Sequence, residues 1–146
     1  QLCLRHNTLF IINDDINLAQ KINADGVHLG TDDASILTAR QQLGDDAVIG
    51  VSCYNDIKLA KTAQNKGANY VAFGALFPSS TKPNAPYCSL EIINQAKKAL
   101  TIPIVGIGGI DFNNQHQAFD AGCDAVAMIN ALFQSIDLPQ DNKART

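Results

Sequence analysis

The chain has 146 residues, a formal net charge of −3 and 46% hydrophobic residues. Its length and apolar content predict one domain with one core, and 17% charged residues is too few for a disordered chain. The acidic balance argues against a nucleic-acid binder, which needs a basic surface. No apolar run reaches the roughly 18 residues of a membrane span, and no signal peptide is recognisable, so we expect a cytoplasmic protein without membrane contact.

The chain contains four cysteines, which are widely scattered: Cys3, Cys53, Cys88 and Cys123. They form no C-x-x-C pair and have no histidine at ligand spacing, so we do not expect a zinc site. Without a secretion signal the thiols should be reduced. The first residue is Gln1 rather than Met, so the sequence can be part of a longer chain.

Apolar runs alternate with amphipathic stretches along the whole sequence. The runs predict strands at 9–12, 26–30, 48–51, 70–73, 103–107 and 125–129. The stretches between them predict helices, including one at 112–121 and a short one from 130 to 134. Asp33, Asp56 and Ser89 are candidate N-caps, and glycines at 44, 67 and 122 are expected helix ends.

Six successive βα units indicate a parallel sheet covered by helices. The approaches to the fourth and sixth strands are alike, Gly67-Ala68-Asn69 and Gly122-Cys123-Asp124. This repetition favours a TIM (β/α)8 barrel, with a doubly wound sheet as the alternative. A barrel typically needs ~200 residues or more. We therefore expect about six of the eight units in a single domain over residues 1–136, with the first two units lacking and a polar tail over 137–146.

The active site of such a barrel lies at the carboxyl ends of the strands. Asp14 and Asp33 follow two neighbouring strands. Each alone could cap the following helix, but paired carboxylates near a phosphate site could hold Mg²⁺, which prefers oxygen ligands. The sequence therefore suggests a magnesium site.

Two further segments are candidates for binding phosphate. Pro78-Ser79-Ser80-Thr81-Lys82 lies in a long loop, where hydroxyls, backbone N–H groups and a lysine suit an anion; the alternative is a solvated surface loop. Gly106-Ile107-Gly108-Gly109-Ile110 ends a strand and opens a helix. If two units are missing, this is strand seven and Ile129-Asn130 follows strand eight, the usual position of a barrel phosphate site.

The three histidines indicate no catalytic triad. His6 and His116 are expected at the surface, and His28, in the middle of a strand, is expected to be a hydrogen-bonded core residue rather than a base. No Ser-His-Asp or Cys-His order supports covalent hydrolysis.

Six segments at the expected strand ends share their residue types and order with one known family. They are Phe10–Asp15, Asp25–Asp33, Ile49–Ser52, Gly74–Lys82, Ile104–Ile110 and, more loosely, Val126–Ala131. In this combination, over roughly residues 4–134, the chain resembles the thiamine phosphate synthases. Within their superfamily are also the TenI-type thiazole tautomerases.

The resemblance implies a Mg²⁺-dependent transferase with two small-molecule substrates. It couples a pyrimidine methyl diphosphate to a thiazole phosphate by a dissociative mechanism and releases pyrophosphate. By motif position, Asp14 and Asp33 resemble the metal ligands, and Ser52 and Lys82 the catalytic residues. The diphosphate contacts correspond to Asn13, Ser52 and Lys82, and the thiazole-phosphate contacts to Ser79, Ser80, Thr81, Gly109, Ile129 and Asn130.

The sequence also departs from the family pattern. Thr31, Ser79 and Asn130 stand where the family usually has Gln, Thr and Ser, and nothing matches the Gln/Arg/Lys cluster that contacts the diphosphate. Two other functions are therefore kept: a thiazole tautomerase, which needs neither Mg²⁺ nor Lys82, and a phosphate-binding barrel fragment without turnover. Six units leave open sheet edges, so we expect self-association or a further segment that completes the barrel.

Overall fold

The computed structural model describes residues 2–30, 33–78 and 86–133, without the side chains of residues 33–35. Within these ranges six strands form one parallel sheet in the order β1-β2-β3-β4-β5-β6. The strands are β1 (Ile11–Asn13), β2 (Gly26–Leu29), β3 (Val48–Tyr54), β4 (Tyr70–Phe73), β5 (Ile104–Ile107) and β6 (Ala125–Ala127). Sequential neighbours that all pair in parallel are the βα succession expected from the sequence.

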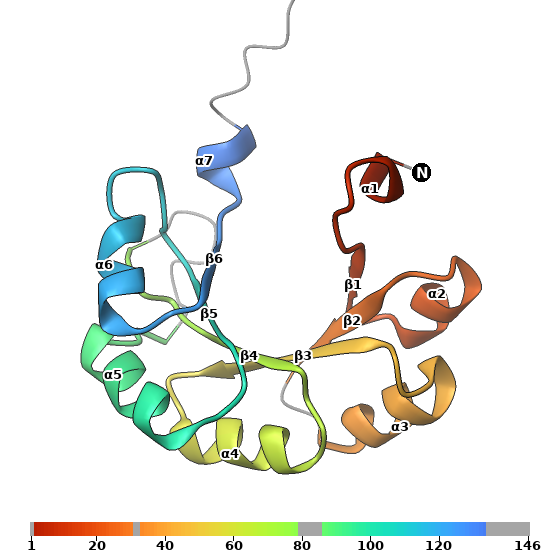
Figure 1. Cartoon of the computed structure of the whole chain (residues 1–146). Helices are drawn as coiled ribbons and strands as arrows, with labels where there is room; N and C mark the ends of the chain where they lie inside the picture. Colours follow the sequence, from red (N-terminus) through yellow and green to blue (C-terminus); the bar gives the residue numbers. More distant parts are fainter. Residues whose placement is uncertain (1, 31–32, 79–85, 134–146) are drawn as a thin grey trace, which may run out of the picture.

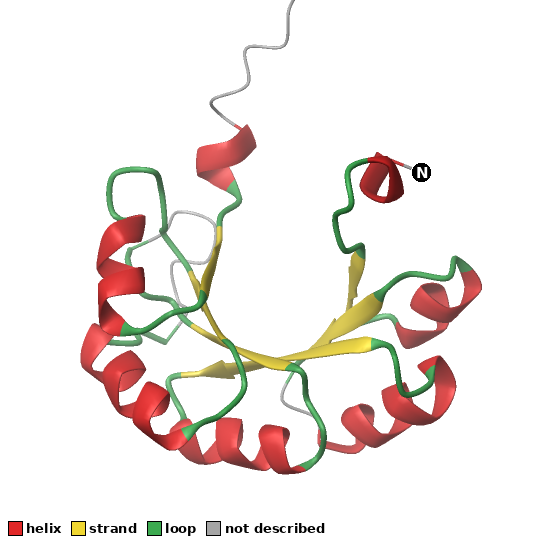
Figure 2. Ribbon diagram, viewed as in Figure 1, coloured by secondary structure: helices red, strands yellow, loops and turns green. Residues whose placement is uncertain are grey.

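The sheet curves into an open half-barrel, with the helices between Ile16 and Ala121 along its outer side (Figures 1 and 2). The helices are α1 (Leu2–Arg5), α2 (Ile16–Lys21), α3 (Asp33–Leu43), α4 (Ile57–Asn65), α5 (Leu90–Ala99), α6 (Gln115–Ala121) and α7 (Asn130–Phe133). β1 and β6 lie at the two free ends of the curve (Figure 1). Among these helices none is both long and apolar enough to cross a membrane.

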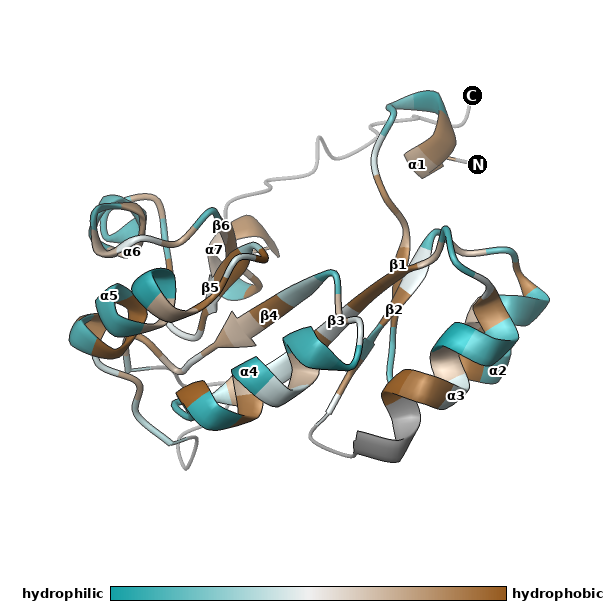
Figure 3. Cartoon of the chain, turned by 60° about the horizontal axis from the view of Figure 1, so that its bottom comes forward, coloured by the Kyte–Doolittle hydropathy of each residue, from teal (hydrophilic) through white to brown (hydrophobic). Residues whose placement is uncertain are grey.

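The hydrophobic core lies between the convex face of the sheet and the helices. Alternate strand residues point to this face, and those of the central strands are fully buried, among them Val27, Ile49, Val51, Val71 and Phe73. The helices meet them largely through alanines, which let a helix approach the sheet closely: Ala19, Ala39, Ala60, Ala63, Ala96 and Ala118. The helices carry both hydrophilic and hydrophobic residues, as one-sided packing requires (Figure 3).

The concave face is built differently. Its central residues, His28, Ser52 and Tyr70, are polar and only half-buried. Gly50 lies between them in the sheet, and a Cβ atom there would lie 2.0 Å from the Tyr70 ring. The ring therefore crosses over Gly50 and reaches from β4 to β2. A closed barrel would fill this face with side chains from every strand; here it remains accessible.

The predicted helix ends are confirmed. Gly44, Gly67 and Gly122 have φ values of +86°, +92° and +114°, in the left-handed region that glycine adopts without strain. Asp56 caps α4 by accepting from the N–H groups of Lys58 and Leu59. The polar tail predicted for residues 137–146 lies outside the described residues.

Several boundaries predicted from the sequence are wrong. Ser52 was expected to follow its strand but lies within β3, which continues to Tyr54 through an irregularity in the pairing with β4. The helix expected from 112 starts at Gln115, because the Asp111 carboxylate accepts the Asn113 and Asn114 N–H groups and holds the preceding turn. Ser89 stands at the N-cap position of α5 but makes no capping hydrogen bond with its side chain.

The similar residues that precede several strands each make a pair of hydrogen bonds to the neighbouring strand. Asn69 donates its N–H to the Ile49 carbonyl at 2.7 Å, and its side-chain oxygen accepts the Ile49 N–H at 2.8 Å. Asp124 makes the same pair of bonds with Ile104, and Asp25 makes them with Phe10. Each side chain thereby fixes the start of one strand against that of its neighbour, at the end of the sheet opposite the expected site.

We expect Asn69→Ala to destabilise the protein by about 1–2 kcal/mol, because the Ile49 N–H and an Arg40 N–H that Asn69 now accepts would lose their acceptor. Urea unfolding would measure the change. Asn65→Ala, an exposed residue at the end of α4, is the matched control and should change stability by less than about 0.5 kcal/mol. Equal effects of the two substitutions would contradict a register-fixing role.

The paired hydrogen bonds of Asp124 should also make the stability of the protein depend on pH. Hydrogen bonds from Lys97 and then from the Ile104 N–H lower the pKa of Asp124 below its ordinary value. A lowered pKa in the folded state gives stability that is present above the unfolded-state pKa and is lost as pH falls through the folded-state pKa. Asp124→Asn should therefore weaken the protein against urea at about pH 7, and weaken it less at about pH 3. The same deficit at both pH values would contradict this.

Candidate functional site

Asn13 and Asp14 lie at the carboxyl end of β1, where the sequence placed them. The Asp14 N–H donates to the His28 carbonyl at 2.8 Å, and Asn13 Nδ2 donates to Asp14 Oδ2 at 2.7 Å. Asp14 has a φ of +61° and an exposed carboxylate. The helix cap is its neighbour Asp15, which accepts from the Leu18 N–H. Asp14 is therefore free of the capping role that was its alternative.

The second predicted metal ligand is placed by its backbone only. Asp33 is the first residue of α3 rather than the residue before it, so it does not stand at the N-cap position considered for it. Its side chain lies outside the described part of the chain. Across the described ranges, no group of three or more His, Cys, Asp or Glu side chains is placed to hold a metal ion.

Ser52 belongs to a chain of hydrogen bonds across three strands. Its Oγ lies 2.9 Å from His28 Nε2, and His28 Nδ1 lies 2.9 Å from the Tyr70 hydroxyl. The His28 and Tyr70 rings also stack, with centroids 5.5 Å apart and planes at 28°. His28 is hydrogen-bonded, as predicted from the sequence, but the predicted core position is wrong, because the residue lies half-buried on the concave face. Burial lowers the pKa of His28, opposed in part by the nearby Asp14 carboxylate, and burial raises the pKa of the Tyr70 hydroxyl.

The long loop after β4 is held at both of its described ends. The Leu76 and Phe77 N–H groups donate to the carbonyls of Ile107 and Gly108. On the far side, Ala75 exchanges hydrogen bonds with Pro86 and Cys88. The loop therefore starts on the turn that follows β5. Ser79, Ser80, Thr81 and Lys82 lie outside the described residues.

The turn after β5 is packed against this loop. Gly108 and Gly109 have φ values of +95° and +62°, and a Cβ atom on Gly109 would lie 2.4 Å from the Pro78 carbonyl oxygen. A side chain at either position would collide with the loop after β4, so both residues must be glycine. Asn114 holds the turn by donating from Nδ2 to the Gly109 carbonyl at 2.9 Å. Successive glycines in left-handed conformations can present N–H groups to an anion.

The last predicted contacts lie after β6. Ile129 is 54% exposed, and Asn130 is the first residue of α7. The N–H groups of Leu132 and Phe133 donate to the Ile129 carbonyl. β6 ends at Ala127, two residues earlier than predicted, so Ile129 lies in the turn between the strand and α7.

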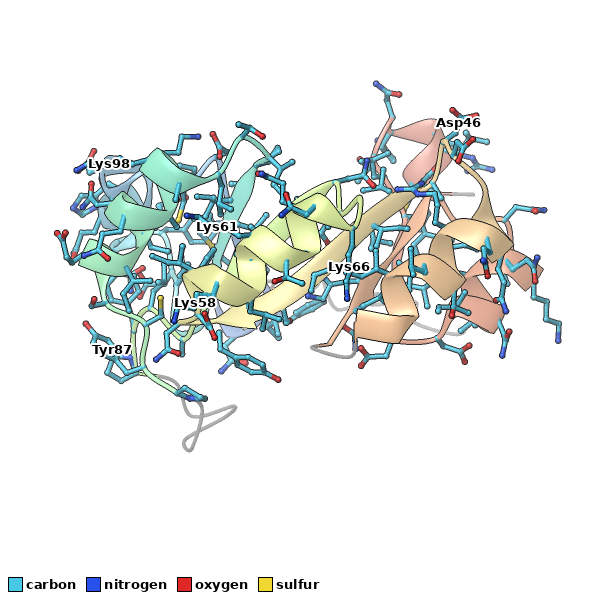
Figure 4. All side chains as sticks on the ribbon, turned by 90° about the horizontal axis from the view of Figure 1, so that it is seen from below. Asp46, Lys58, Lys61, Lys66, Tyr87 and Lys98 are labelled. Atoms are coloured by element: carbon cyan, nitrogen blue, oxygen red, sulfur yellow. The ribbon has the colours of Figure 1, made fainter. Side chains whose placement is uncertain are left out.

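Positive charge is absent from the strands and strand ends of the described chain. The lysines and arginines of these ranges lie on helices or on the turn that ends α4. Lys58, Lys61 and Lys98 are exposed on the helical side of the molecule (Figure 4). Among the predicted diphosphate contacts, Asn13, Ser52 and Lys82, the lysine is the one that carries a positive charge.

The buried cysteines do not add to the site. Burial raises the pKa of Cys53 to about 12 and those of Cys88 and Cys123 to about 11. Thiols with raised pKa values are poor nucleophiles and metal ligands. His6 and His116 are exposed, as predicted.

Two residues of this region were missed in the sequence. Tyr70 begins a strand, far along the chain from His28, and only the pairing of three strands brings it there across Gly50. Asn114 could have been found, because Asp-x-x-Asn after a glycine turn is a pattern in which both side chains bond the local backbone.

Comparison with known proteins identifies the relatives of this chain. The family model described as thiamine monophosphate synthase matches residues 1–132. A thiamine-phosphate synthase from Methylobacillus flagellatus is 53% identical over 137 residues, which are 94% of this chain and 65% of the relative. Another, from Halorhodospira halophila, is 48% identical over 94% of this chain and 66% of the relative.

Solved structures agree with these sequence matches. Thiamine phosphate pyrophosphorylase from Pyrococcus furiosus superposes with a TM-score of 0.83 at 33% identity, over 94% of this chain and 65% of that chain. The present chain thus spans slightly less than two thirds of the length of its relatives. With its six-stranded half-barrel, its strand-end motifs and a family match over residues 1–132, this chain belongs to the thiamine monophosphate synthase family.

Proposed function

We propose that this chain forms the larger part of a thiamine phosphate synthase, a transferase that joins a pyrimidine methyl diphosphate to a thiazole phosphate. The observation that supports this most is the convergence of Asp14, Ser52 and the Gly108–Gly109 turn at the carboxyl ends of one parallel sheet. The site offers charge stabilisation and positioning, and its histidine is engaged in hydrogen bonds. A dissociative transfer needs these two contributions rather than a strong nucleophile.

The residues at the β1 end fit a magnesium ion. Asp14 presents an exposed carboxylate at a sheet edge that also carries the Asn13 side chain. Mg²⁺ binds through one or two carboxylates, water and substrate phosphates, so a cluster of three acidic side chains is not required. Asp14 and Asp33 would hold the ion, and when bound it would neutralise charge on the departing pyrophosphate.

The remaining contacts divide between two anions. Asn13, Ser52 and Lys82 would bind the diphosphate, and Lys82 and Ser52 would stabilise the negative charge that develops as pyrophosphate leaves. Ser79, Ser80, Thr81, Gly109, Ile129 and Asn130 would bind the thiazole phosphate. The hydrogen bonds of Leu76 and Phe77 support this division, because they hold the described start of the loop, up to Pro78, beside the Gly108–Gly109 turn.

We further propose that the functional unit is a complete TIM barrel with two βα units besides the six seen here. The half-buried concave face and the exposed apolar residues near the two free edges support this, among them Leu9, Phe10, Leu132 and Phe133. The missing Gln/Arg/Lys cluster would come from those units. They would belong to the same polypeptide or to a second one that associates with it.

The comparisons favour the synthase over the two alternatives. The relatives described above are named as synthases or pyrophosphorylases, and none as a tautomerase. Asp14 also offers an exposed carboxylate that does not cap a helix, which a reaction without a leaving diphosphate would not need. A fragment that binds phosphate without turnover is distinguished by assay.

We expect protein isolated from its natural source, with its intact mass recorded, to release pyrophosphate when both substrates are present. Chelation of Mg²⁺ should abolish this release, and added Mg²⁺ should restore it. A coupled pyrophosphate assay would measure both. Binding of the substrates without release would instead support the non-catalytic alternative, and turnover of the thiazole alone without Mg²⁺ would support the tautomerase.

We expect Asp14→Asn to lower the Mg²⁺-dependent rate at least about 100-fold, because it removes one metal-binding charge. Asn tolerates the positive φ of this position, so the fold should persist. Asp15→Ser is the matched control: it removes a neighbouring charge but keeps an N-cap acceptor for α2. A Mg²⁺ titration of the rate for both variants would decide, and equal losses would contradict a metal-binding role for Asp14.

A further inference from the structure

The donor and acceptor roles in the hydrogen bonds of His28 depend on which ring nitrogen carries the proton. The Tyr70 hydroxyl and Ser52 Oγ each lie 2.9 Å from one ring nitrogen. A neutral imidazole has one donor and one acceptor nitrogen. Either Tyr70 donates to Nδ1 and Nε2–H donates to Ser52, or Ser52 donates to Nε2 and Nδ1–H donates to Tyr70.

The two arrangements leave a different hydroxyl hydrogen without an acceptor among the described residues. In the second, it is that of Tyr70, which lies at the start of β4 with its ring packed over Gly50 and stacked on His28. No acceptor for it other than Nδ1 occurs in the described ranges. In the first, it is the hydrogen of Ser52, near the carboxyl end of β3 where a ligand or water can accept it. The first arrangement gives the phenol hydrogen a protein acceptor and leaves the hydroxyl nearer the strand end, that of Ser52, to meet a ligand.

The phenol is also the better donor of the two hydroxyls, because its oxygen carries a more acidic proton than an aliphatic alcohol. Gly50 makes the arrangement possible, since a Cβ atom there would collide with the Tyr70 ring at 2.0 Å. The need of the phenol hydrogen for an acceptor and its greater acidity both select the same tautomer, with Nδ1 as acceptor and Nε2 protonated.

We infer that Tyr70 and His28 are positioning residues that commit Ser52 to donating its hydroxyl hydrogen into the site. Tyr70 donates to His28 Nδ1, and Nε2–H donates to Ser52 Oγ. The Ser52 lone pair that faces His28 is thereby occupied, and its O–H points to an acceptor-only partner such as a phosphate oxygen. This rests on the proposed function only in the identity of that partner, the leaving diphosphate.

The tautomer can be measured without turnover. Long-range ¹H–¹⁵N spectra of the chain labelled in histidine should show His28 Nε2 as the protonated nitrogen and Nδ1 as the unprotonated one. Tyr70→Phe should reduce this preference, because it removes the donor to Nδ1. Tyr87→Phe, at a residue that is 64% exposed, is the matched control and should leave the His28 signals unchanged. A protonated Nδ1 in the unmodified chain, with Nε2 free or also protonated, would overturn the inference.

The coupling to Ser52 can be measured in the pyrophosphate-release assay. His28→Asn can still face Tyr70 but is too short to reach Ser52, so kcat should fall about tenfold, as for loss of one hydrogen bond. His28→Gln restores an N–H near the position of Nε2 and should recover most of this loss. The exposed His116→Asn is the control for the substitution itself and should leave kcat unchanged.

The decisive comparison is made in a Ser52→Ala background. If His28 acts through Ser52, adding His28→Asn to Ser52→Ala should lower kcat by less than about twofold more. A further tenfold loss would show an independent or merely structural role and would overturn the inference. If the unmodified protein has no turnover, the proposed function fails, whereas the tautomer measurement still decides the arrangement of Tyr70, His28 and Ser52.

Discussion

The structure depends on the alternation of side chains along parallel strands, which divides every strand between two environments. On the convex side, Val27, Ile49 and Val71 are fully buried beneath helices that contribute mainly alanines. On the concave side, the same strands present His28, Ser52 and Tyr70, which remain half-buried. Stability and chemistry are therefore carried by different residues of the same short segments. A substitution on one face need not disturb the other, since the backbone between them is fixed by parallel pairing.

The two ends of the sheet are divided in a similar way. At the amino ends, Asn69, Asp124 and Asp25 bridge neighbouring strand starts with paired hydrogen bonds. At the carboxyl ends, comparable groups are left available: the Asp14 carboxylate is exposed, and paired glycines follow β5. Barrels of this kind concentrate stabilising residues at one end and reactive residues at the other. The fixed end holds the strands in register, and the open end can then vary its side chains and loops.

Most of the fold could be predicted from the sequence, because apolar runs and glycine helix ends are local signals. The six strands and the ends at Gly44, Gly67 and Gly122 were of this kind. Asp14 could be placed because strand ends share one edge. Strand and helix limits were less predictable where a side chain competes with the backbone, as Asp111 does before α6. Tyr70 could not be found at all, since its contact with His28 depends on the register of three strands.

Gly50 has no functional group, yet the contact between Tyr70 and His28 across those three strands depends on it. Its missing side chain leaves a gap through which the Tyr70 ring reaches His28, and any larger residue would separate them while leaving both unchanged. The identity of a residue on β3 thus controls a contact between β2 and β4. In a library of variants, position 50 should behave as a functional position although it touches no reactant. A search limited to polar or titratable residues would pass over it, and a redesign that preserved only the reactive side chains could lose the arrangement without altering one of them.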